Sequence, residues 1–247
     1  MALDPIHIGA GGYRLVRVDN AIVREPGTNI PKIPGTTIEG CARTYSYYKK
    51  KEKNLNTSSM NEACAVGKKM KIKGKEQQPC GKCDVCITYG FTTDEKSLHG
   101  MAQFSDARIL FFPVHSTIGP VWITCPSILK EFGIDENISN DEIKTSINKE
   151  KLNLGWIYLK KEGDFNASRL YDNLKKGGEL EEIPNEFKQI EQRIVLVSDK
   201  LFSQIVNSNL EVRTSVAIDP TTGAAEEGAL YTYEAIPRAT MFWFNLV

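Results

Sequence analysis

Three cysteines in the stretch PCGKCDVCITYG, residues 79–90, constrain the fold of this chain more than any other sequence feature. Two consecutive Cys-x-x-Cys spacings keep Cys80, Cys83 and Cys86 close together, and in a reducing compartment clustered thiols favour a metal over disulfides. A tetrahedral zinc site needs a fourth ligand. We expect Cys64 to supply it, with His99 as the alternative. Because four protein ligands leave no position for water or substrate, this zinc would be structural.

The same residues match one half of a catalytic zinc motif. Nucleobase deaminases combine Pro-Cys-x-x-Cys with His-x-Glu, and residues 79–83 read PCGKC. None of the three histidines is followed by a glutamate two positions later. The sequence therefore argues against a deaminase, and any catalysis is expected outside the cysteines.

The charge of the chain is balanced overall and uneven locally. Its 247 residues include 31 lysines and arginines and 31 acidic residues. Between Arg43 and Lys82 stand eleven basic residues and three acidic ones, which indicates a polyanion at one face, with a solvated loop as the alternative. No apolar run approaches the roughly 20 residues that span a bilayer, and the N-terminus lacks the features of a signal peptide. We therefore expect a cytoplasmic protein without a membrane partner.

Strands and helices alternate irregularly along the chain, which is typical of an α+β fold. We expect strands at 13–18, 109–114, 121–124, 193–197 and 240–246, and one at 155–161 that interrupts an acidic, helical or loop-rich insertion at 131–192. Helices are expected after a cap at Thr36 or Thr37, at Pro126 and Ser127, and after Ser198 or Asp199. Residues 49–80 lack periodicity and indicate a basic, partly mobile loop. The turn DPTTG, residues 219–223, predicts a hairpin over about 208–235.

Four segments together resemble one family. They are HIGAGG with VDNAIVREPGTNIPKIPGTTIEGCAR, HGMAQFSDARILFFPV, VWITCP and EEGALYTYEAIPRATMF, and they are similar to the RAMP-superfamily backbone subunit of type III-B CRISPR effector complexes. The similarity runs from His7 to Phe242 and leaves out 49–79 and 131–192. The stretch CGKCDVCITYG is instead similar to zinc-bearing backbone subunits of type I-D complexes, which bind a guide and do not cut RNA in this way.

This resemblance implies a modified RRM-like, ferredoxin-like palm with helical or loop finger insertions and a protruding β-hairpin thumb. It implies one domain over residues 1–247, with insertions at about 49–99 and 131–192. It also implies that copies of the chain stack along a CRISPR RNA with other effector subunits. Their thumbs would disrupt the guide–target duplex at regular intervals, beside which target RNA is cut. We expect Mg²⁺ or another divalent cation to assist cleavage, because Mg²⁺ prefers oxygen ligands such as a carboxylate.

The resemblance also implies roles for single residues. Asp19 matches the acidic residue required for cleavage, and His7 and Glu227 match further positions implicated in it. The residues expected to bind RNA are Gly35, Thr36, Thr37 and Arg43 at a helix start, and Arg213 in the hairpin. A helix N-terminus offers free N–H groups to a phosphate. Glu39 stands where the family often has a basic residue, which removes one expected phosphate contact.

Each catalytic candidate also has an ordinary structural interpretation. Asp19 can be a turn or cap residue, His7 a hydrogen-bonded histidine near the core, and Glu227 a solvated charge. The alternative function is therefore a guide-binding scaffold that does not cut RNA and holds a structural zinc.

Overall fold

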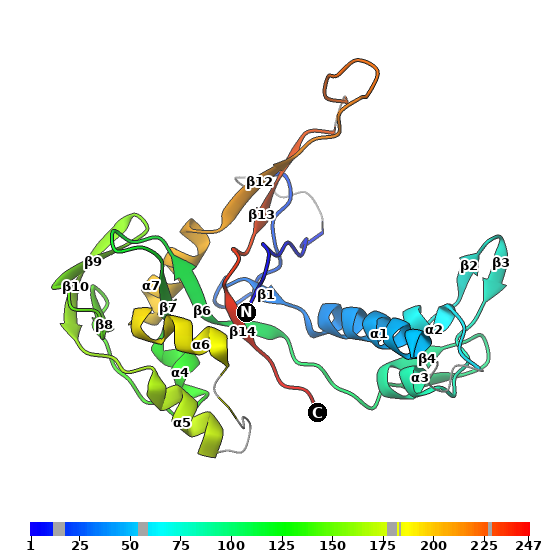
Figure 1. The fold of residues 1–247 in the computed structure, drawn as a ribbon, viewed down its shortest axis with the longest axis horizontal. Helices are drawn as coiled ribbons and strands as arrows, with labels where there is room; N and C mark the ends of the chain where they lie inside the picture. The colour runs from blue at the N-terminus through cyan, green and yellow to red at the C-terminus, as the bar shows by residue number, and fades with distance from the viewer. Residues whose placement is uncertain (12–17, 54–58, 177–181, 183, 227–228) are drawn as a thin grey trace. The chain divides into compact units, whose positions relative to one another are not determined.

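The computed structural model describes residues 1–11, 18–53, 59–176, 182, 184–226 and 229–247 (Figure 1). They form two compact units, and each is considered by itself. Unit 1 comprises Met1–Lys32 and Arg108–Trp243, and unit 2 comprises Ile33–Ala107 and Phe244–Val247. The α+β class predicted from the sequence is confirmed. Among the described residues, no helix combines the length and apolar character needed to cross a bilayer.

A mixed sheet of eight strands forms the centre of unit 1. Its strands are β1 (Lys32–Ile33), β6 (Ala107–Val114), β7 (Val121–Thr124), β8 (Glu142–Thr145), β9 (Lys151–Leu154), β10 (Ile157–Gly163), β11 (Ile194–Leu196) and β14 (Met241–Trp243). They lie in the order β1-β6-β7-β11-β8-β10-β9, and β14 also pairs with β6. The pairs β7–β11 and β8–β10 are parallel, whereas β6–β7, β8–β11, β9–β10 and β6–β14 are antiparallel.

Helices cover both faces of this sheet. On one face, α7 (Asp199–Ser208) buries Phe202 and Ile205 against the strands. On the other, α4 (Pro126–Lys130), α5 (Ser168–Lys176) and α6 (Asn185–Ile190) contribute to a second apolar cluster, and the short helix η1 (Glu191–Arg193) leads into β11. Val195 of β11 belongs to the first cluster and its neighbours Ile194 and Leu196 to the second, as the alternation of a β-strand requires.

Most elements of unit 1 agree with the sequence. The strands expected at 109–114, 121–124, 155–161 and 193–197 are present, α4 begins at Pro126, and the Ser198 hydroxyl caps α7 by accepting from the Leu201 N–H at 3.3 Å. The segment 131–192 differs from expectation, because β8 and β9 join the sheet where helix or loop was expected. The strand expected at 13–18 lies, except for Val18, outside the described residues.

The predicted hairpin follows α7 directly. It consists of β12 (Glu211–Ser215) and β13 (Tyr231–Ala235), paired antiparallel, and Figure 1 shows it projecting from the sheet of unit 1 in orange and red. Toward the tip, Ile218 bridges to Ala225, and the Gly223 N–H donates to the Asp219 carbonyl oxygen at 2.8 Å. Val212, Ile218 and Leu230 are exposed along the hairpin, and none of the described residues in its distal part, 216–226 and 229–230, is buried.

Unit 2 is a smaller assembly of short elements around cysteines. They are α1 (Gly35–Glu52), α2 (Ala63–Val66), β2 (Met70–Ile72), β3 (Lys75–Gln77), α3 (Asp84–Tyr89), β4 (Gly90–Thr92) and β5 (Ser97–His99). Tyr47, Val85 and Phe91 pack with three of the cysteines to form its core. The loop prediction for 49–80 was wrong in part, because this stretch contains the end of α1, α2 and the β2–β3 hairpin. The capping prediction was also wrong: Pro34 is the N-cap of α1, and Thr36 and Thr37 lie inside its first turn.

Candidate active site and metal centre

Asp19 lies in a segment that pairs with the base of the hairpin. The Asn20 N–H donates to the Thr232 carbonyl at 3.0 Å, and the Glu234 N–H donates to the Asn20 carbonyl at 3.1 Å. The Asp19 Oδ2 atom accepts two hydrogen bonds from Thr232, from its N–H at 2.7 Å and from its hydroxyl at 2.9 Å. The side chain is exposed, and none of the hydrogen bonds among the described residues uses Oδ1. One oxygen therefore holds the carboxylate in place while the other faces solvent.

These hydrogen bonds also fix the charge of Asp19. The Thr232 backbone N–H, followed by the Thr232 hydroxyl, holds the pKa of Asp19 below its usual value of 3.8. The carboxylate is therefore anionic throughout the neutral range. A fixed anionic oxygen open to solvent can orient a hydroxyl group or hold a hard divalent cation, whereas its low pKa makes it a weak base.

His7 meets the same strand of the hairpin. Its Nδ1–H donates to the Glu234 carbonyl oxygen at 2.6 Å, and its ring contacts Tyr233 edge-on with centroids 5.1 Å apart. Because a carbonyl oxygen can only accept, the proton of the neutral ring is on Nδ1, and Nε2 remains an acceptor. The structure thus attaches Asp19 and His7 to neighbouring residues of β13. Glu227, the third candidate, lies outside the described residues.

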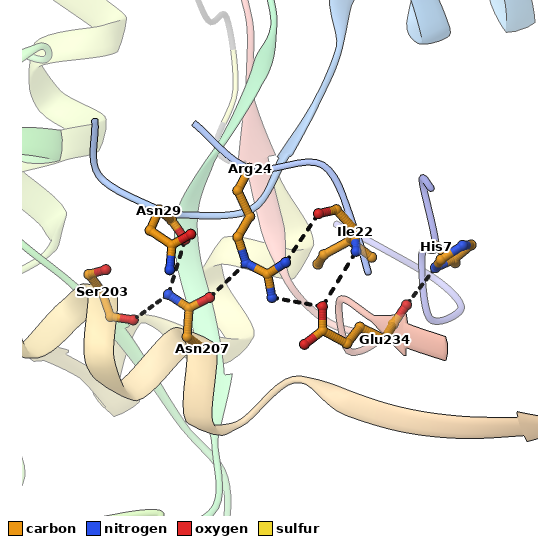
Figure 2. Close-up of polar contacts among 7 residues, drawn as sticks. All are labelled: His7, Ile22, Arg24, Asn29, Ser203, Asn207 and Glu234. Carbon is orange, nitrogen blue, oxygen red and sulfur yellow. Dashed lines mark hydrogen bonds and ion pairs between the residues drawn. The ribbon is translucent and has the colours of Figure 1, made fainter. Parts of the chain in front are cut away.

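Sequence reasoning missed two charged residues that join these segments, Arg24 and Glu234. Figure 2 shows the Arg24 guanidinium between the Glu234 carboxylate and Asn207 of α7, with Nη2 to Oε2 at 2.7 Å and Nε to Oδ1 at 3.0 Å. Glu234 Oε2 also accepts from the Ile22 N–H at 3.4 Å, and Arg24 Nη1 donates to the Ile22 carbonyl at 3.1 Å. Their only sequence signal was their position within VRE and YEA, inside the segments that carry the family resemblance.

The helix start expected to bind phosphate is closely packed within unit 2. The Gly35 N–H donates to Asp106 Oδ1 at 2.8 Å, and a side chain at Gly35 would place its Cβ 2.2 Å from the Phe104 carbonyl oxygen. Glycine is therefore required there by close approach of another backbone. The Thr37 N–H donates to the Pro34 carbonyl at 2.9 Å, while the side chain of Thr36 is exposed. The polar surface at this helix start consists mainly of Thr36 and Thr37.

Arg43 has a different role from the expected phosphate contact. It is only 7% exposed, and its guanidinium donates to the carbonyl oxygens of Cys64 at 2.8 Å and Gly90 at 2.6 Å. Nη1 also reaches the Tyr89 carbonyl at 3.3 Å. These bonds connect α1 to α2 and to the junction of α3 and β4. A side chain directed into unit 2 in this way is an internal anchor and does not present its charge to RNA.

Arg213 remains on the surface of the hairpin. It is exposed on β12 in register with Tyr233, and its nearest described carboxylate is that of Glu211, with Nη1 to Oε2 at 3.8 Å. This pair is too long and too exposed to neutralise the arginine. Arg213 is therefore available to a polyanion beside the segment that holds Asp19.

Four cysteines come together in unit 2: Cys64, Cys80, Cys83 and Cys86, called the cysteine cluster below. Their sulfur atoms all lie within 4.8 Å of one another, and three of the four side chains are buried. His99, the alternative ligand, is exposed on β5 and is not part of the cluster. Cys64 is thus the fourth member that the structure brings to the three consecutive cysteines.

The geometry of the cysteine cluster fits a tetrahedral metal ion. Zinc–sulfur bonds of about 2.3 Å require sulfur atoms about 3.8 Å apart, so a small contraction of the cluster suffices. Backbone N–H groups of Cys80, Cys83 and Cys86 point at the sulfurs of Cys64, Cys80 and Cys83, at 3.3 to 3.5 Å, and would stabilise thiolates. A hydrogen bond from Cys86 lowers the pKa of Cys64 to about 4. The cluster can hold a metal ion through four protein ligands, which leaves no open coordination position.

Comparison with known proteins identifies the family of the chain. The sequence matches the profile of the RAMP superfamily over residues 1–246. It is 28% identical over 262 residues to the CRISPR system Cmr endoribonuclease Cmr4 of Pyrococcus furiosus, an alignment that covers 98% of this chain and 77% of the relative. It is 31% identical over 97 residues to the CRISPR system Cms endoribonuclease Csm3 of Methanothermobacter thermautotrophicus, covering 39% of this chain and 29% of the relative.

Solved structures share the fold at lower sequence identity. The cryo-EM structure of type III-B Cmr-beta bound to cognate target RNA contains a chain with a TM-score of 0.63 and 14% identity, matched over 99% of this chain and 80% of that chain. The crystal structure of oligomeric Cmr4 from Pyrococcus furiosus gives 0.61 and 20%, over 100% and 78%. The fold is therefore an α+β palm of the RRM-like kind that carries a β-hairpin thumb. The chain belongs to the RAMP superfamily.

Proposed function

We propose that this chain is the repeated, guide-binding backbone subunit of a type III CRISPR effector complex and cleaves guide-paired target RNA at regular intervals in antiviral defence. The observation that carries the proposal is Asp19: its carboxylate is held through Oδ2 by Thr232 at the base of the hairpin, and Oδ1 has no hydrogen bond among the described residues. The alignment with a curated endoribonuclease over 98% of this chain supports the same activity.

The chemistry proposed is attack by a ribose 2′-hydroxyl on the adjacent phosphodiester: the 2′-oxygen bonds to phosphorus and loses its proton, and the bond from phosphorus to the 5′-oxygen breaks. The products are a 2′,3′-cyclic phosphate and a 5′-hydroxyl, whose oxygen has gained a proton. This needs the hydroxyl oxygen, the phosphorus and the leaving oxygen in line, and a regular duplex does not provide that geometry. The hairpin would displace one nucleotide and so allow alignment beside Asp19. Asp19 Oδ1 would then orient the hydroxyl or bind a divalent cation, and Mg²⁺, which prefers oxygen ligands, would supply charge stabilisation at the phosphate. His7 Nε2, on a ring held against β13 of the hairpin, is a further acceptor.

RNA contacts are proposed on both units. Thr36 and Thr37, next to the packed Gly35, form the polar start of α1 and would meet guide phosphates. Arg213 on β12 would meet RNA beside the hairpin. Base pairing reads the target sequence, so these contacts need only recognise backbone and shape. Stacked copies of the chain and other effector subunits would complete the particle.

The cysteine cluster is proposed to bind one structural zinc. A reducing cytoplasm would keep the four thiols available to it, and we place the protein there. A closed tetrathiolate site has no position for water, so zinc would order unit 2 and take no part in cleavage.

A second candidate function is a guide-binding scaffold that does not cut RNA. The closed cysteine cluster favours it, because this feature is similar to zinc-bearing backbone subunits that do not cut RNA in this way. The two candidates differ only in whether Asp19 is needed for chemistry.

Reconstituted complexes that carry Asp19→Asn distinguish the candidates. We expect target-RNA cleavage to fall by about 10²–10⁴-fold, the range for loss of a positioned acid–base or ligand group, with target affinity unchanged. Asp135→Asn, at another exposed aspartate, is the matched control and should cut normally. Cleavage by the Asp19 variant at the rate of the control would leave this chain as the scaffold.

A further inference from the structure

Arg24 and Glu234 form an ion pair that holds the backbone of Ile22, a residue of the segment bearing Asp19. Glu234 accepts from the Ile22 N–H and Arg24 donates to the Ile22 carbonyl, so the two side chains hold both polar groups of one residue while they contact each other (Figure 2). Their side chains are only 19% and 14% exposed. A pair this sheltered is held in one geometry more firmly than an exposed pair.

The same pair is connected to the core of unit 1. Arg24 Nε donates to Asn207 Oδ1 on α7 at 3.0 Å, and the Asn207 amide donates to the carbonyls of Ser203 at 2.8 Å and Asn29 at 3.1 Å. Ile22 itself is 3% exposed and belongs to the apolar cluster that α7 covers. Ile22, three residues after Asp19, is therefore fixed to α7, the helix that leads directly into the hairpin.

The backbone of Glu234 contacts both the neighbour of Asp19 and the second catalytic candidate, His7. Its N–H donates to the Asn20 carbonyl, and its own carbonyl accepts from His7. Thr232, two residues earlier on the same strand, holds the Asp19 carboxylate. Displacement of Glu234 would therefore move the backbone next to Asp19, the ring of His7 and the base of the hairpin together.

From this arrangement we infer that Arg24 and Glu234 are positioning residues for cleavage, which keep Asp19 in register with the hairpin that displaces the target nucleotide. The inference rests on the proposed function. The pair touches no reacting group; its effect passes through Asn20, Ile22 and His7. A misplacement of about 1 Å of a catalytic group can cost on the order of 10²-fold in rate, so a change at this distance has a measurable consequence.

The main test is Glu234→Gln in the reconstituted complex, which keeps the size of the side chain and removes its charge. Glu136→Gln is a matched control, because Glu136 is also 14% exposed and forms ion pairs with Lys144 and Arg169, none of them on β13 or near Asp19. Single-turnover cleavage at saturating target, target affinity and melting temperature are measured for both. Amide exchange in residues 18–24 reports directly on the segment.

We expect both variants to lower the melting temperature by similar amounts. Only Glu234→Gln should slow cleavage, by about 10–100-fold, with target affinity within about twofold and faster exchange at 18–24. Arg24→Lys keeps the charge but cannot reproduce the planar set of contacts. Its cleavage rate should lie between those of the unmodified complex and of Glu234→Gln, and this milder change gives a test if Glu234→Gln fails to assemble. The double variant, Arg24→Lys with Glu234→Gln, should cut no more slowly than Glu234→Gln alone if the pair acts as one unit.

Equal cleavage rates for Glu234→Gln and Glu136→Gln would overturn the inference, as would unchanged exchange at residues 18–24. Asp19→Asn is included as the reference. If it is inactive and Glu234→Gln cuts normally, the inference fails and the proposed function stands. If Asp19→Asn itself cuts normally, the proposed function fails and the inference fails with it.

Discussion

The cysteine cluster of unit 2 and the Asp19 site of unit 1 are built in opposite ways. The cysteines are mostly buried, lie within 23 residues of one another in the sequence, and turn all four ligands toward each other. Asp19 is exposed, is held by a residue 213 positions away, and keeps one carboxylate oxygen unused among the described hydrogen bonds. A site whose ligands satisfy one another stabilises structure, whereas a site with a fixed, unsatisfied anionic group can act on another molecule.

The difference extends to the surroundings of the two sites. Arg43 points inward and donates to the backbone carbonyls of Cys64, a member of the cysteine cluster, and of Gly90. Arg24 also points inward, yet the segment it holds presents Asp19 to solvent. Both arginines are structural in their contacts, and only the second one holds a segment that carries an exposed carboxylate.

Removal of the cysteine ligands tests this contrast with the largest expected effect. Cys83→Ser with Cys86→Ser should reduce zinc from one per chain to none, because structural zinc contributes about 10–16 kcal/mol of apparent binding free energy in small modules. Amide protection of residues 64–99 should be lost, whereas cleavage by complexes that still assemble should fall far less than with Asp19→Asn. Metal analysis, hydrogen exchange and cleavage rates check these outcomes.

Cys41→Ser is the control, since Cys41 is exposed on α1 and lies outside the cysteine cluster. Full retention of zinc by the double variant would mean that other ligands hold the metal. Loss of cleavage as complete as that of Asp19→Asn, in a complex that assembles, would end the separation between a structural and a catalytic site.

Shortening the hairpin tests whether the Asp19 site depends on a distant part of unit 1. Deletion of residues 219–223 removes a turn held by its own contacts, such as the Thr221 N–H to Asp219 Oδ1 at 2.8 Å, and no buried side chain. We expect an unchanged melting temperature. Cleavage at regular intervals should fade, because the nucleotide is no longer displaced for in-line attack.

A variant with residues 219–223 replaced by an equally long Gly-Ser sequence keeps the reach of the hairpin and serves as the control. Sequencing of the cleavage products gives both spacing and rate. If the deletion cuts at the original spacing and rate, the hairpin is not the element that displaces the target.

The same contrast explains what the sequence predicted well. Local signals identified β6, β7 and β11 as short apolar runs, the Ser198 cap of α7 and the DPTTG turn, because each depends on neighbouring residues. Three members of the cysteine cluster were predictable for the same reason, because Cys80, Cys83 and Cys86 are closely spaced, whereas the choice of Cys64 over His99 as the fourth depended on the fold.

Non-local partners explain what the sequence did not predict. β8 and β9 have only four residues each, so their alternation of polar and apolar residues is too short to be recognised as a strand pattern. Pairing with β11 and β10 makes these segments strands. Arg43 looked like a surface charge because its acceptors at Cys64 and Gly90 are assembled only in the fold. Beyond its place in a segment of the family resemblance, Glu234 gave no signal, because its partner Arg24 is 210 positions away.

The hydroxyl of Thr232 should tune Asp19 with a smaller effect. Thr232→Val removes one of the two hydrogen bonds to Oδ2 and keeps the backbone one, so the pKa of Asp19 should rise toward 3.8. A carboxyl group with a lowered pKa in the folded protein stabilises the fold above its unfolded pKa, and this contribution is lost as pH falls through the folded value. The higher pKa of Asp19 in Thr232→Val should move the acid limb of the pH profile of cleavage to higher pH, while the cleavage rate near pH 7 falls by less than about tenfold.

Thr214→Val provides the control for this change. Thr214 stands directly opposite Thr232 in the hairpin register and makes no described hydrogen bond to Asp19. Its pH profile should match that of the unmodified complex. Identical acid limbs for both variants would show that the Thr232 hydroxyl does not act on Asp19.

The smallest expected effect on cleavage concerns two glycines of unit 2 with the same backbone conformation. Gly67 and Gly74 both have φ of +78°, so alanine at either position strains the backbone, by about 1 kcal/mol. At Gly74 a new Cβ meets nothing within 4 Å, whereas at Gly67 it would lie 2.4 Å from Arg43 Nη1. Gly67→Ala must therefore also displace the guanidinium from the carbonyls of Cys64 and Gly90, which adds about 1–3 kcal/mol for buried groups left unsatisfied.

We expect Gly67→Ala to release zinc faster than Gly74→Ala in a chelator competition, with cleavage per assembled complex equal in the two variants. Equal zinc release would mean that Arg43 does not anchor the cysteine cluster, and slower cleavage in Gly67→Ala alone would mean that the cluster influences the Asp19 site after all.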